Sequence, residues 1–267
     1  ELYSKNLIFS PNKITKKQLN IKIGTAGSTS LILQTLFLAS FRNDLRIRME
    51  GGGTWNLHAP SVLYLQEVFL PLLKLNNKIE ILRNGYYPKG GAVVDSKINK
   101  TELDHFDLME RKNLNDIKVF SIASNHLKKS NVAERQSQSA INLLGRNYDN
   151  IIRKISYVNS INPGSGILVV ADFGNTKIGY DAVGEKGKQS EIIGREAAEG
   201  LLNILKSGAT VDDFMLDQII PFFAIGNGGK FKFNIMTQHA ETNIEIIKKF
   251  LDVEFRIKDN ILEVENN

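Results

Sequence analysis

The pattern of hydrophobic and polar residues in the first hundred positions predicts short strands that alternate with two apolar helices. Strands are expected where apolar residues alternate with polar ones or end at glycine or proline: 7–10, 19–23, 45–49 and 92–98. Helices are expected over 30–38, directly after the small residues 24–28, and over 61–73. This alternation of strands and helices is typical of an α/β fold.

Residues 112–209 have a different pattern, with more polar helix faces and without the paired glycines of the flanking segments. The pattern predicts an α/β set of its own. Strands are expected over 117–122, 152–158 and 167–173, and helices over 132–144 and 191–205, the last of which ends near Gly208. Both ends of this segment are polar, as is usual where one domain is inserted into a loop of another. We therefore expect one domain formed by 1–111 and 210–267, and a smaller domain formed by 112–209.

Two apolar segments outside this middle region resemble each other. Phe69–Leu73 and Ile219–Phe223 each place a proline inside a helix-like run, and each leads through paired glycines into a strand. The resemblance favours a repeated α/β unit, and chance recurrence of common loop chemistry is the alternative.

Composition limits the chemistry that the chain can perform. It has 267 residues and no cysteine, which excludes disulfides, thiolate nucleophiles and cysteine-ligated zinc. The net charge of +5 would attract a polyanion such as nucleic acid, although solvated lysines without a function would give the same excess. No apolar run approaches the roughly 20 residues that span a bilayer, and none follows the early lysines as in a signal peptide. We expect a cytoplasmic protein without a membrane segment.

The residues with the most distinctive chemistry lie near the C-terminus. Asp217 and Gln218 place an acid beside an amide, and His239 precedes a helix predicted over 242–251. Thr242 or Asn243 can cap that helix, whose free backbone N–H groups would favour a phosphate near His239. This arrangement suits phosphoryl or nucleotidyl transfer, and a purely structural histidine is the alternative.

Together with motifs elsewhere in the chain, these residues resemble the RNA 3′-terminal phosphate cyclase family. No single motif is unusual, but their order and spacing are specific, and the resemblance covers nearly the whole chain. The matching residues are Ile23–Ser28 with Leu33–Thr35, Gly52–Thr54 with Ala59–Pro60, Gly85–Gly91, Gly194–Glu196, Asp217–Gln218, and His239 with Thr242–Asn243.

The resemblance implies an α/β fold in which repeated βαβαββ units form the larger domain, with an inserted smaller thioredoxin-like α/β domain. It also implies an enzyme, a nucleotidyl-transferring ligase that uses ATP to convert an RNA 3′-terminal phosphate to a 2′,3′-cyclic phosphate. In such an enzyme His239 attacks the α-phosphate of ATP, and the histidine-AMP passes AMP to the RNA as an RNA-adenylate. A divalent metal, Mg or Mn, and basic side chains would neutralise the phosphates.

The resemblance also assigns nucleotide-binding roles by position. Gln34 corresponds to an amide near the nucleotide phosphates, and Asp217 and Gln218 correspond to an adenosine-contacting pair. Pro60 takes the position that packs on one face of adenine, and Phe214 the position on the other face. The family usually has tyrosine there, so Phe214 keeps the stacking, loses a hydroxyl contact and should modestly weaken nucleotide binding.

Each of these residues also has a structural alternative. Asp217 can join helix-surface pairs, Gln34 can satisfy a buried backbone group, and Pro60 can end a turn. The glycines at 24–27 and 90–91 can serve tight packing alone. Three further histidines match no motif, so we expect them at the surface or in local hydrogen bonds: His58, His105 and His126.

One part of the family pattern has no counterpart in this sequence. Family members begin with a glycine-rich segment and a helix that carry an acidic metal-binding residue and several arginines, so we assign no metal ligand here. The alternative function is that of a non-catalytic, cyclase-like RNA-binding factor in ribosome biogenesis. Those relatives dispense with the catalytic histidine, so His239 favours the enzyme. The spacing of Asp217, Gln218 and His239 argues against a third possibility, a transferase for a small phosphorylated metabolite.

Overall fold

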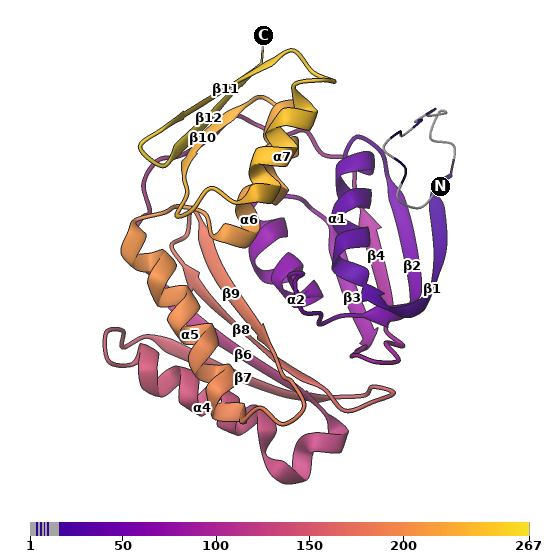
Figure 1. Cartoon of the computed structure of the whole chain (residues 1–267), viewed down its shortest axis with the longest axis vertical. Coiled ribbons are helices and arrows are strands. Elements are labelled where there is room, and N and C mark those ends of the chain that lie inside the picture. The colour runs from indigo at the N-terminus through magenta and orange to yellow at the C-terminus, as the bar shows by residue number, and fades with distance from the viewer. Residues whose placement is uncertain (1–3, 5, 7, 9, 11–15, 267) are drawn as a thin grey trace.

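The computed structural model describes residues 4, 6, 8, 10 and 16–266, and shows a mixed α/β fold. Its strands form three four-stranded sheets, with the helices packed between and against them (Figure 1). The strand predicted over 7–10 lies largely outside the described residues. Within the described part of the chain, none of the helices combines the length and the apolar character that crossing a bilayer requires.

The first sheet contains strands of both orientations in the order β1-β2-β4-β3. β1 and β2 are parallel, whereas β4 is antiparallel to both of its neighbours. The inner face packs on the adjacent helices, as when Leu33 and Phe37 join Met49 in one hydrophobic core. The elements are β1 (Gln18–Ser28), α1 (Thr29–Ser40), β2 (Leu45–Gly53), α2 (Val62–Tyr64), η1 (Leu65–Phe69), α3 (Leu70–Leu72), β3 (Lys78–Arg83) and β4 (Val93–Ile98).

The helix predicted over 61–73 is present, but its middle turn is widened. Residues 65–69 form a π-helical segment, closed by a hydrogen bond from the Leu70 N–H to the Leu65 carbonyl. Pro71 follows directly and has no N–H to offer the preceding turn, and its ring would clash with the carbonyl four residues earlier in a regular α-helix. The wide turn lets the helix continue through the proline.

The C-terminal sheet repeats this order of elements. Its strands follow the order β11-β12-β10-β5, with β5 and β10 parallel and β12 antiparallel to both of its neighbours. In chain order both sheets are therefore strand, helix, strand, helix, strand, strand, but residues 109–212 separate the first strand of this sheet from its first helix. The elements are β5 (Phe106–Leu108), α6 (Asp213–Ile225), β10 (Gly229–Lys232), α7 (Gln238–Ile247), β11 (Val253–Lys258) and β12 (Ile261–Asn266).

The two proline-containing runs do not occupy corresponding places in these two sheets. Pro71 lies in α3, the helix between the second and third strands, whereas Pro221 lies in α6, the helix between the first and second strands. Their resemblance therefore reflects shared local chemistry, and it does not align one sheet with the other.

The third sheet is built from the middle of the chain, in the order β7-β6-β8-β9. The strands and helices predicted there are all present within two residues, and Gly208 ends the last helix with a left-handed φ of 79°. The two long helices pack on one face, around Val119, Ile167 and Leu201. The elements are β6 (Asp116–Ser124), η2 (Asn125–Ser130), α4 (Val132–Leu144), β7 (Ile151–Val158), β8 (Ser165–Asp172), β9 (Lys177–Val183) and α5 (Ser190–Ser207).

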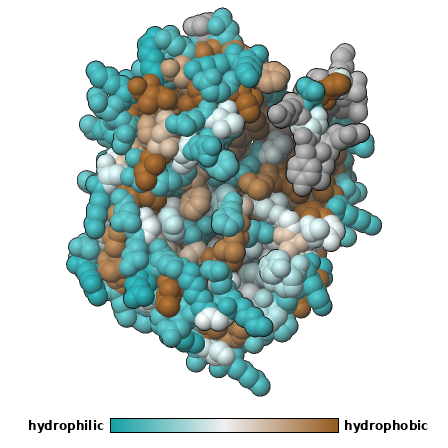
Figure 2. All heavy atoms as spheres, viewed as in Figure 1, coloured by the Kyte–Doolittle hydropathy of each residue, from teal (hydrophilic) through white to brown (hydrophobic). Residues whose placement is uncertain are grey.

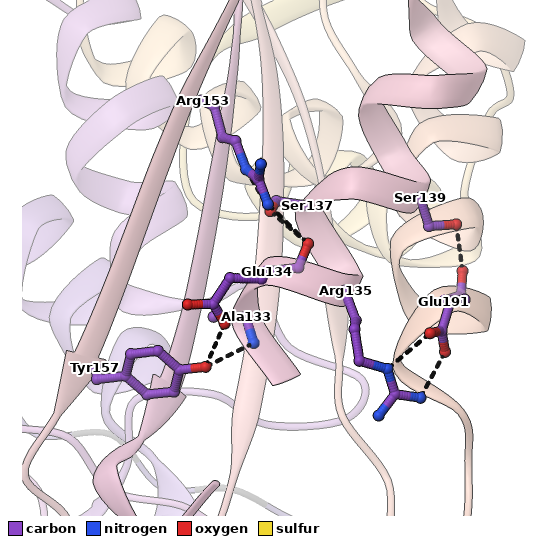
Figure 3. Close-up of polar contacts among 8 residues, drawn as sticks. All are labelled: Ala133, Glu134, Arg135, Ser137, Ser139, Arg153, Tyr157 and Glu191. Atoms are coloured by element: carbon purple, nitrogen blue, oxygen red, sulfur yellow. Dashed lines mark hydrogen bonds and ion pairs between the residues drawn. The ribbon is translucent and has the colours of Figure 1, made fainter. Parts of the chain in front are cut away.

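Polar contacts fix α4 between β7 and α5 (Figure 3). From β7, the Arg153 guanidinium donates to the Ser137 hydroxyl and the Glu134 carbonyl, and the Tyr157 hydroxyl donates to the Glu134 carboxylate. On the other side, the Arg135 guanidinium makes a two-pronged ion pair with Glu191 of α5. Two-pronged arginine–carboxylate pairs define orientation as well as distance, so α4 is held in register with both neighbours.

The opposite face of the third sheet packs into the core of the rest of the protein. Leu168 and Val170 are buried in the same hydrophobic cluster as Trp55 and Tyr64. The backbones approach so closely that a Cβ atom on Gly166 would lie 2.2 Å from the Trp55 ring. The middle segment is therefore joined to the remainder of the chain by a continuous apolar interface.

The close crossing of α4 and α5 makes Gly194 sensitive to substitution. A Cβ atom there would lie 2.0 Å from the Gln136 carbonyl oxygen of α4, so the helices would have to separate. We expect Gly194→Ala to lower the free energy of unfolding by about 2–4 kcal/mol despite the better helix propensity of alanine. Urea denaturation measures this, and Arg195→Ala, on the exposed side of the same turn, serves as a control that should change stability by less than about 0.5 kcal/mol. Equal effects of the two changes would contradict the tight crossing.

Candidate functional site

The structure corrects the predicted start of the C-terminal helix. The helix was expected to begin near Thr242, but α7 begins at Gln238 and the Thr237 hydroxyl caps it, accepting the Ala240 N–H at 3.1 Å. Thr242 is inside the helix and donates to the Gln238 carbonyl. His239 therefore lies in the first helical turn, where the unpaired N–H groups and the positive end of the helix dipole favour a phosphate.

His239 is exposed and interacts with Asp217 of α6. Burial raises the pKa of the Asp217 carboxyl, and the charge of His239 opposes that rise. The two helices are also joined through their motif residues, because the Asn243 side-chain amide donates to the Asp217 carbonyl at 2.9 Å. The structure thus brings Asp217 of α6 together with His239 and Asn243 of α7, although Asp217 lies 22 or more residues from both in the sequence.

The two glutamines assigned to nucleotide binding each have a buried polar atom without a partner among the described residues. These atoms are Nε2 of Gln34 and Oε1 of Gln218. The other amide atom of Gln218 is used, since its nitrogen donates to the Phe214 carbonyl at 2.5 Å. Unpartnered buried polar groups are rare in proteins, so one free donor and one free acceptor at the positions assigned by resemblance fit a polar ligand.

Pro60 lies beside the start of two helices. Its carbonyl accepts a hydrogen bond of 2.5 Å from the Ser30 hydroxyl of α1, one turn before Gln34. The next residue, Ser61, caps α2 through the Tyr64 N–H. Pro60 is thereby hydrogen-bonded to α1, the helix that contains Gln34. Through its neighbour Ser61 it is also linked to Tyr64 of α2.

Phe214, at the start of α6, packs against two tyrosines from different parts of the fold. Its ring centroid lies 5.9 Å from that of Tyr64 in an edge-on arrangement and 5.4 Å from that of Tyr180 of β9. Aromatic pairs at such distances prefer these tilted geometries. The ring that the sequence assigned to adenine stacking is therefore held by a preformed aromatic cluster.

Phe214 and Ala59, the neighbour of Pro60, line the same pocket. It has a volume of about 420 Å³ and lies between the 56–59 loop, β9 and α5. Asp181 and Tyr180 form part of its wall, and acidic and amide side chains of α5 form its rim. Figure 2 shows hydrophilic residues over most of the face seen in Figure 1, with hydrophobic side chains among them across the middle of the molecule.

The glycine motifs have a packing explanation in this structure. Gly52 has a φ of +72°, and its carbonyl accepts the Ala92 N–H at 3.1 Å. A Cβ atom on Gly85 would lie 2.2 Å from that same carbonyl oxygen, and one on Gly51 would lie 1.9 Å from the Ile23 carbonyl oxygen. The glycines thus permit three backbone segments to meet. The small residues Gly24–Ser28 before α1 are extended and belong to β1.

The remaining histidines take local roles or lie at the surface. His105 Nδ1 is 2.9 Å from the Asn227 carbonyl oxygen, as expected for a local hydrogen bond. His126 is exposed in η2. His58 is also exposed, but it lies on the wall of the pocket, which the sequence did not indicate. Across residues 16–266, no three His, Asp or Glu side chains are grouped so that they could hold a metal ion.

Two buried carboxylates beside the pocket were missed in the sequence. The Asp181 carboxylate accepts the Ser61 N–H at 2.6 Å, and burial raises its pKa to about 6. The Asp212 carboxylate is fully buried, and burial raises its pKa to about 7. Asp212 had a detectable signal, since an aspartate before an apolar helix is a typical N-cap. Asp181 had none, because its role depends on a partner 120 residues away.

Of the residues assigned by the resemblance, Phe214 lines the pocket, whereas His239, Gln34, Pro60, Asp217 and Gln218 do not. The first turn of α7, which carries His239, has the free N–H groups with which many nucleotide-binding proteins hold phosphates. Comparison with known proteins places the chain within a family of that class. Its sequence matches the RNA 3′-terminal phosphate cyclase family over residues 1–257. The chain belongs to this enzyme family.

Individual relatives agree with the family match. An RNA 3′-terminal phosphate cyclase of Methanothermobacter thermautotrophicus is 37% identical over 97% of this chain and 77% of its own length. The protein of the same name from Pyrococcus furiosus is also 37% identical, over 98% of this chain and 78% of its own length. A third protein of this name, from Saccharolobus islandicus, is 36% identical over 96% of this chain and 77% of its own length.

The two buried carboxylates should make stability depend on pH. Their folded pKa values lie above the ordinary 3.8, so the folded protein binds more protons than the unfolded chain between about pH 4 and pH 7. The free energy of unfolding should therefore fall as pH rises through this window, by up to about 1.4 kcal/mol per pH unit for each carboxyl. Urea denaturation between pH 5 and pH 8 measures the slope, and Asp212→Asn should flatten it.

Asp172 supplies the control for this pH experiment. The Gly174 N–H and the charges of Lys177 and Lys118 outweigh burial and lower its pKa, so its contribution is lost only as the pH falls below about 4. Asp172→Asn should reduce stability by a similar amount at every pH from 5 to 8. A wild-type protein whose stability rises with pH over this range would contradict the assignment of raised pKa values to Asp181 and Asp212.

Proposed function

We propose that the protein catalyses the ATP-dependent conversion of an RNA 3′-terminal phosphate to a 2′,3′-cyclic phosphate, with His239 as the nucleophile that carries AMP. The observation that carries the proposal is the position of His239, exposed in the first turn of α7, the helix that Asn243 joins to Asp217 of α6 by a hydrogen bond. A neutral imidazole is a good nucleophile near pH 7 and is also able to leave again. The cyclase names of the relatives support the same reaction.

The nucleotide would bind across the starts of α1, α2 and α6. Adenine would stack between Pro60 and Phe214, at the pocket that Ala59 and Phe214 line. The free amide donor of Gln34 would meet a phosphate oxygen, and Asp217 and Gln218 would contact the adenosine. The roles of the two glutamines use two of the buried polar atoms that have no partner among the described residues, Gln34 Nε2 and Gln218 Oε1.

The chemistry consists of three displacements at phosphorus. A His239 ring nitrogen bonds to the α-phosphorus of ATP, the α–β anhydride bond breaks, pyrophosphate leaves and the imidazole loses its proton. An oxygen of the RNA 3′-phosphate then displaces the imidazole and forms the RNA-adenylate. The adjacent ribose 2′-oxygen attacks the terminal phosphorus, AMP leaves and the 2′,3′-cyclic phosphate closes. The N–H groups of the first turn of α7 would stabilise the charge that develops on the phosphoryl oxygens.

A divalent metal, Mg or Mn, remains part of the proposal without assigned ligands. No group of three candidate ligands is present among residues 16–266, so these residues do not form a dedicated metal cage. Mg²⁺ is commonly held by substrate phosphates with one or two carboxylates, and such an ion would arrive with ATP. The cytoplasmic location likewise stays a prediction.

The topology supports a matching proposal for the architecture. In chain order, the first sheet and the C-terminal sheet each follow strand, helix, strand, helix, strand, strand with the same strand order, as two βαβαββ units would. Residues 112–209 would be a domain inserted between β5 and α6 of the second unit. Its sheet order β7-β6-β8-β9, with only β8 reversed, matches the thioredoxin-like domain that the resemblance implies.

The alternative, a non-catalytic cyclase-like factor that binds RNA in ribosome biogenesis, predicts a different site. Such a factor needs neither a nucleophile nor a nucleotide pocket. The exposed His239 and the partnerless amide atoms of Gln34 and Gln218 favour the enzyme.

The histidine adenylate provides a direct test. The protein incubated with ATP labelled in the α-phosphate and Mg²⁺ or Mn²⁺ should acquire an acid-labile, hydroxylamine-sensitive label, measured after denaturing electrophoresis. His239→Ala should reduce the label by about three orders of magnitude or more, because no other group supplies the P–N bond. His126→Ala, at an exposed histidine in η2, should label as wild type does. Labelling that persists in His239→Ala would place the nucleophile elsewhere, and no label in any of the three would favour the binding factor.

The aromatic wall can be tested by nucleotide binding alone. Phe214→Ala should weaken ATP binding about 10- to 100-fold, because stacking on an aromatic ring contributes about 1–3 kcal/mol per base. Phe214→Tyr keeps the ring, restores the residue usual in the family, and should bind ATP as tightly as wild type or slightly more tightly. Calorimetric titration measures both, with the exposed Phe250→Ala as control. Unchanged binding by Phe214→Ala would remove this ring from the adenine site.

A further inference from the structure

Behind Phe214 lies a buried carboxylate for which the proposed chemistry has no direct use. Asp212 is the N-cap of α6, and its side chain is fully buried. A buried carboxylate is unfavourable unless hydrogen bonds compensate for the lost water. The hydrogen-bond donors around Asp212 therefore show which parts of the fold it connects.

Three donors converge on Asp212, and each comes from a different part of the fold. One carboxylate oxygen accepts the Tyr64 hydroxyl at 2.6 Å and the Met215 N–H at 2.9 Å. The other accepts the Gly179 N–H at 2.8 Å. The donors belong to α2, the first turn of α6 and strand β9 of the third sheet.

Each donor is in or next to one member of the aromatic cluster. Tyr64 contacts Phe214 with its own ring, and Gly179 directly precedes Tyr180, whose ring also contacts Phe214. Met215 directly follows Phe214, so capping its N–H fixes the backbone from which the Phe214 ring projects. A single carboxylate is thus hydrogen-bonded to Tyr64 and to the backbone next to Tyr180 and Phe214, the three members of the aromatic cluster.

We propose that Asp212 is the positioning residue of the nucleobase site, and that its three hydrogen bonds hold Phe214 at the angle and depth that base stacking requires. This inference rests on the proposed function, since it takes Phe214 as the wall on which adenine stacks. Asp212 itself touches neither substrate nor reacting atoms. Its loss would therefore weaken recognition of the base and leave recognition of the phosphates in place.

Asparagine at this position tests the proposal with little change in shape. Its amide group has one acceptor oxygen, so in either orientation at least one of the Gly179 and Met215 N–H groups is left facing an NH₂ group. Tyr64→Phe is a milder variant that removes only the hydroxyl and keeps the edge-on ring contact. Asp213→Asn, which removes the neighbouring charge at the same helix terminus, is the matched control.

The readout is the affinity for ATP compared with that for inorganic tripolyphosphate, each measured by calorimetric titration of the folded chain. We expect Asp212→Asn to weaken ATP binding about tenfold or more and Tyr64→Phe about threefold, since stacking is lost only in part, while tripolyphosphate binding changes less than about twofold. Asp213→Asn should change neither. Urea denaturation confirms which variants are folded, and Tyr64→Phe carries the test if Asp212→Asn does not fold.

The possible failures are distinct from one another. If wild type binds ATP no more tightly than tripolyphosphate, no base site exists, and the proposed function loses its adenine slot together with this inference. If wild type prefers ATP but folded Asp212→Asn and Tyr64→Phe keep that preference, the proposed function stands and the positioning role is wrong. Equal losses for both ligands in these variants would mean that Asp212 supports the fold in general, and would also overturn the positioning role.

Discussion

The structure depends on one buried carboxylate that joins three parts of the fold. Asp212 ends the segment that returns from the third sheet, begins α6, and accepts hydrogen bonds from Tyr64 and from Gly179 of β9. Because an unsatisfied buried carboxylate is strongly unfavourable, the arrangement that brings all the donors together is favoured over ones that leave Asp212 without them. The aromatic cluster around Phe214 is a direct result of that arrangement.

The elements that the sequence predicted best are those whose pattern is local. The helix over 132–144 and the strands around it were predicted within two residues, because alternating faces and polar boundaries identify them without tertiary information. The start of α7 was placed four residues late, because Thr237, Thr242 and Asn243 are all acceptable N-caps. Only the hydrogen bond from the Ala240 N–H to the Thr237 hydroxyl, seen in the structure, identifies Thr237 as the cap. The short strand β5 gave no recognisable pattern, since it has three residues, and β10 was indicated only by the paired glycines at its start.

The candidate site shows the same division between local and distant information. His239, Asp217 and Gln218 were selected from motifs, and in the structure their two helices are joined by the hydrogen bond from Asn243 to the Asp217 carbonyl. The partnership of Asp181 with Ser61 could not be predicted, because it joins residues 120 positions apart and leaves no trace in either local pattern. Burial creates the chemical character of such groups, and a sequence does not state burial for an isolated aspartate in a strand.

The apolar interface beneath the third sheet restricts how the molecule can move during turnover. Leu168 and Val170 pack in the same core as Trp55. Moving residues 112–209 outward would expose these side chains to water, at a free-energy cost of about 25 cal/mol per Å² of apolar area. An outward movement of residues 112–209 would therefore carry a free-energy cost that grows with the apolar area exposed.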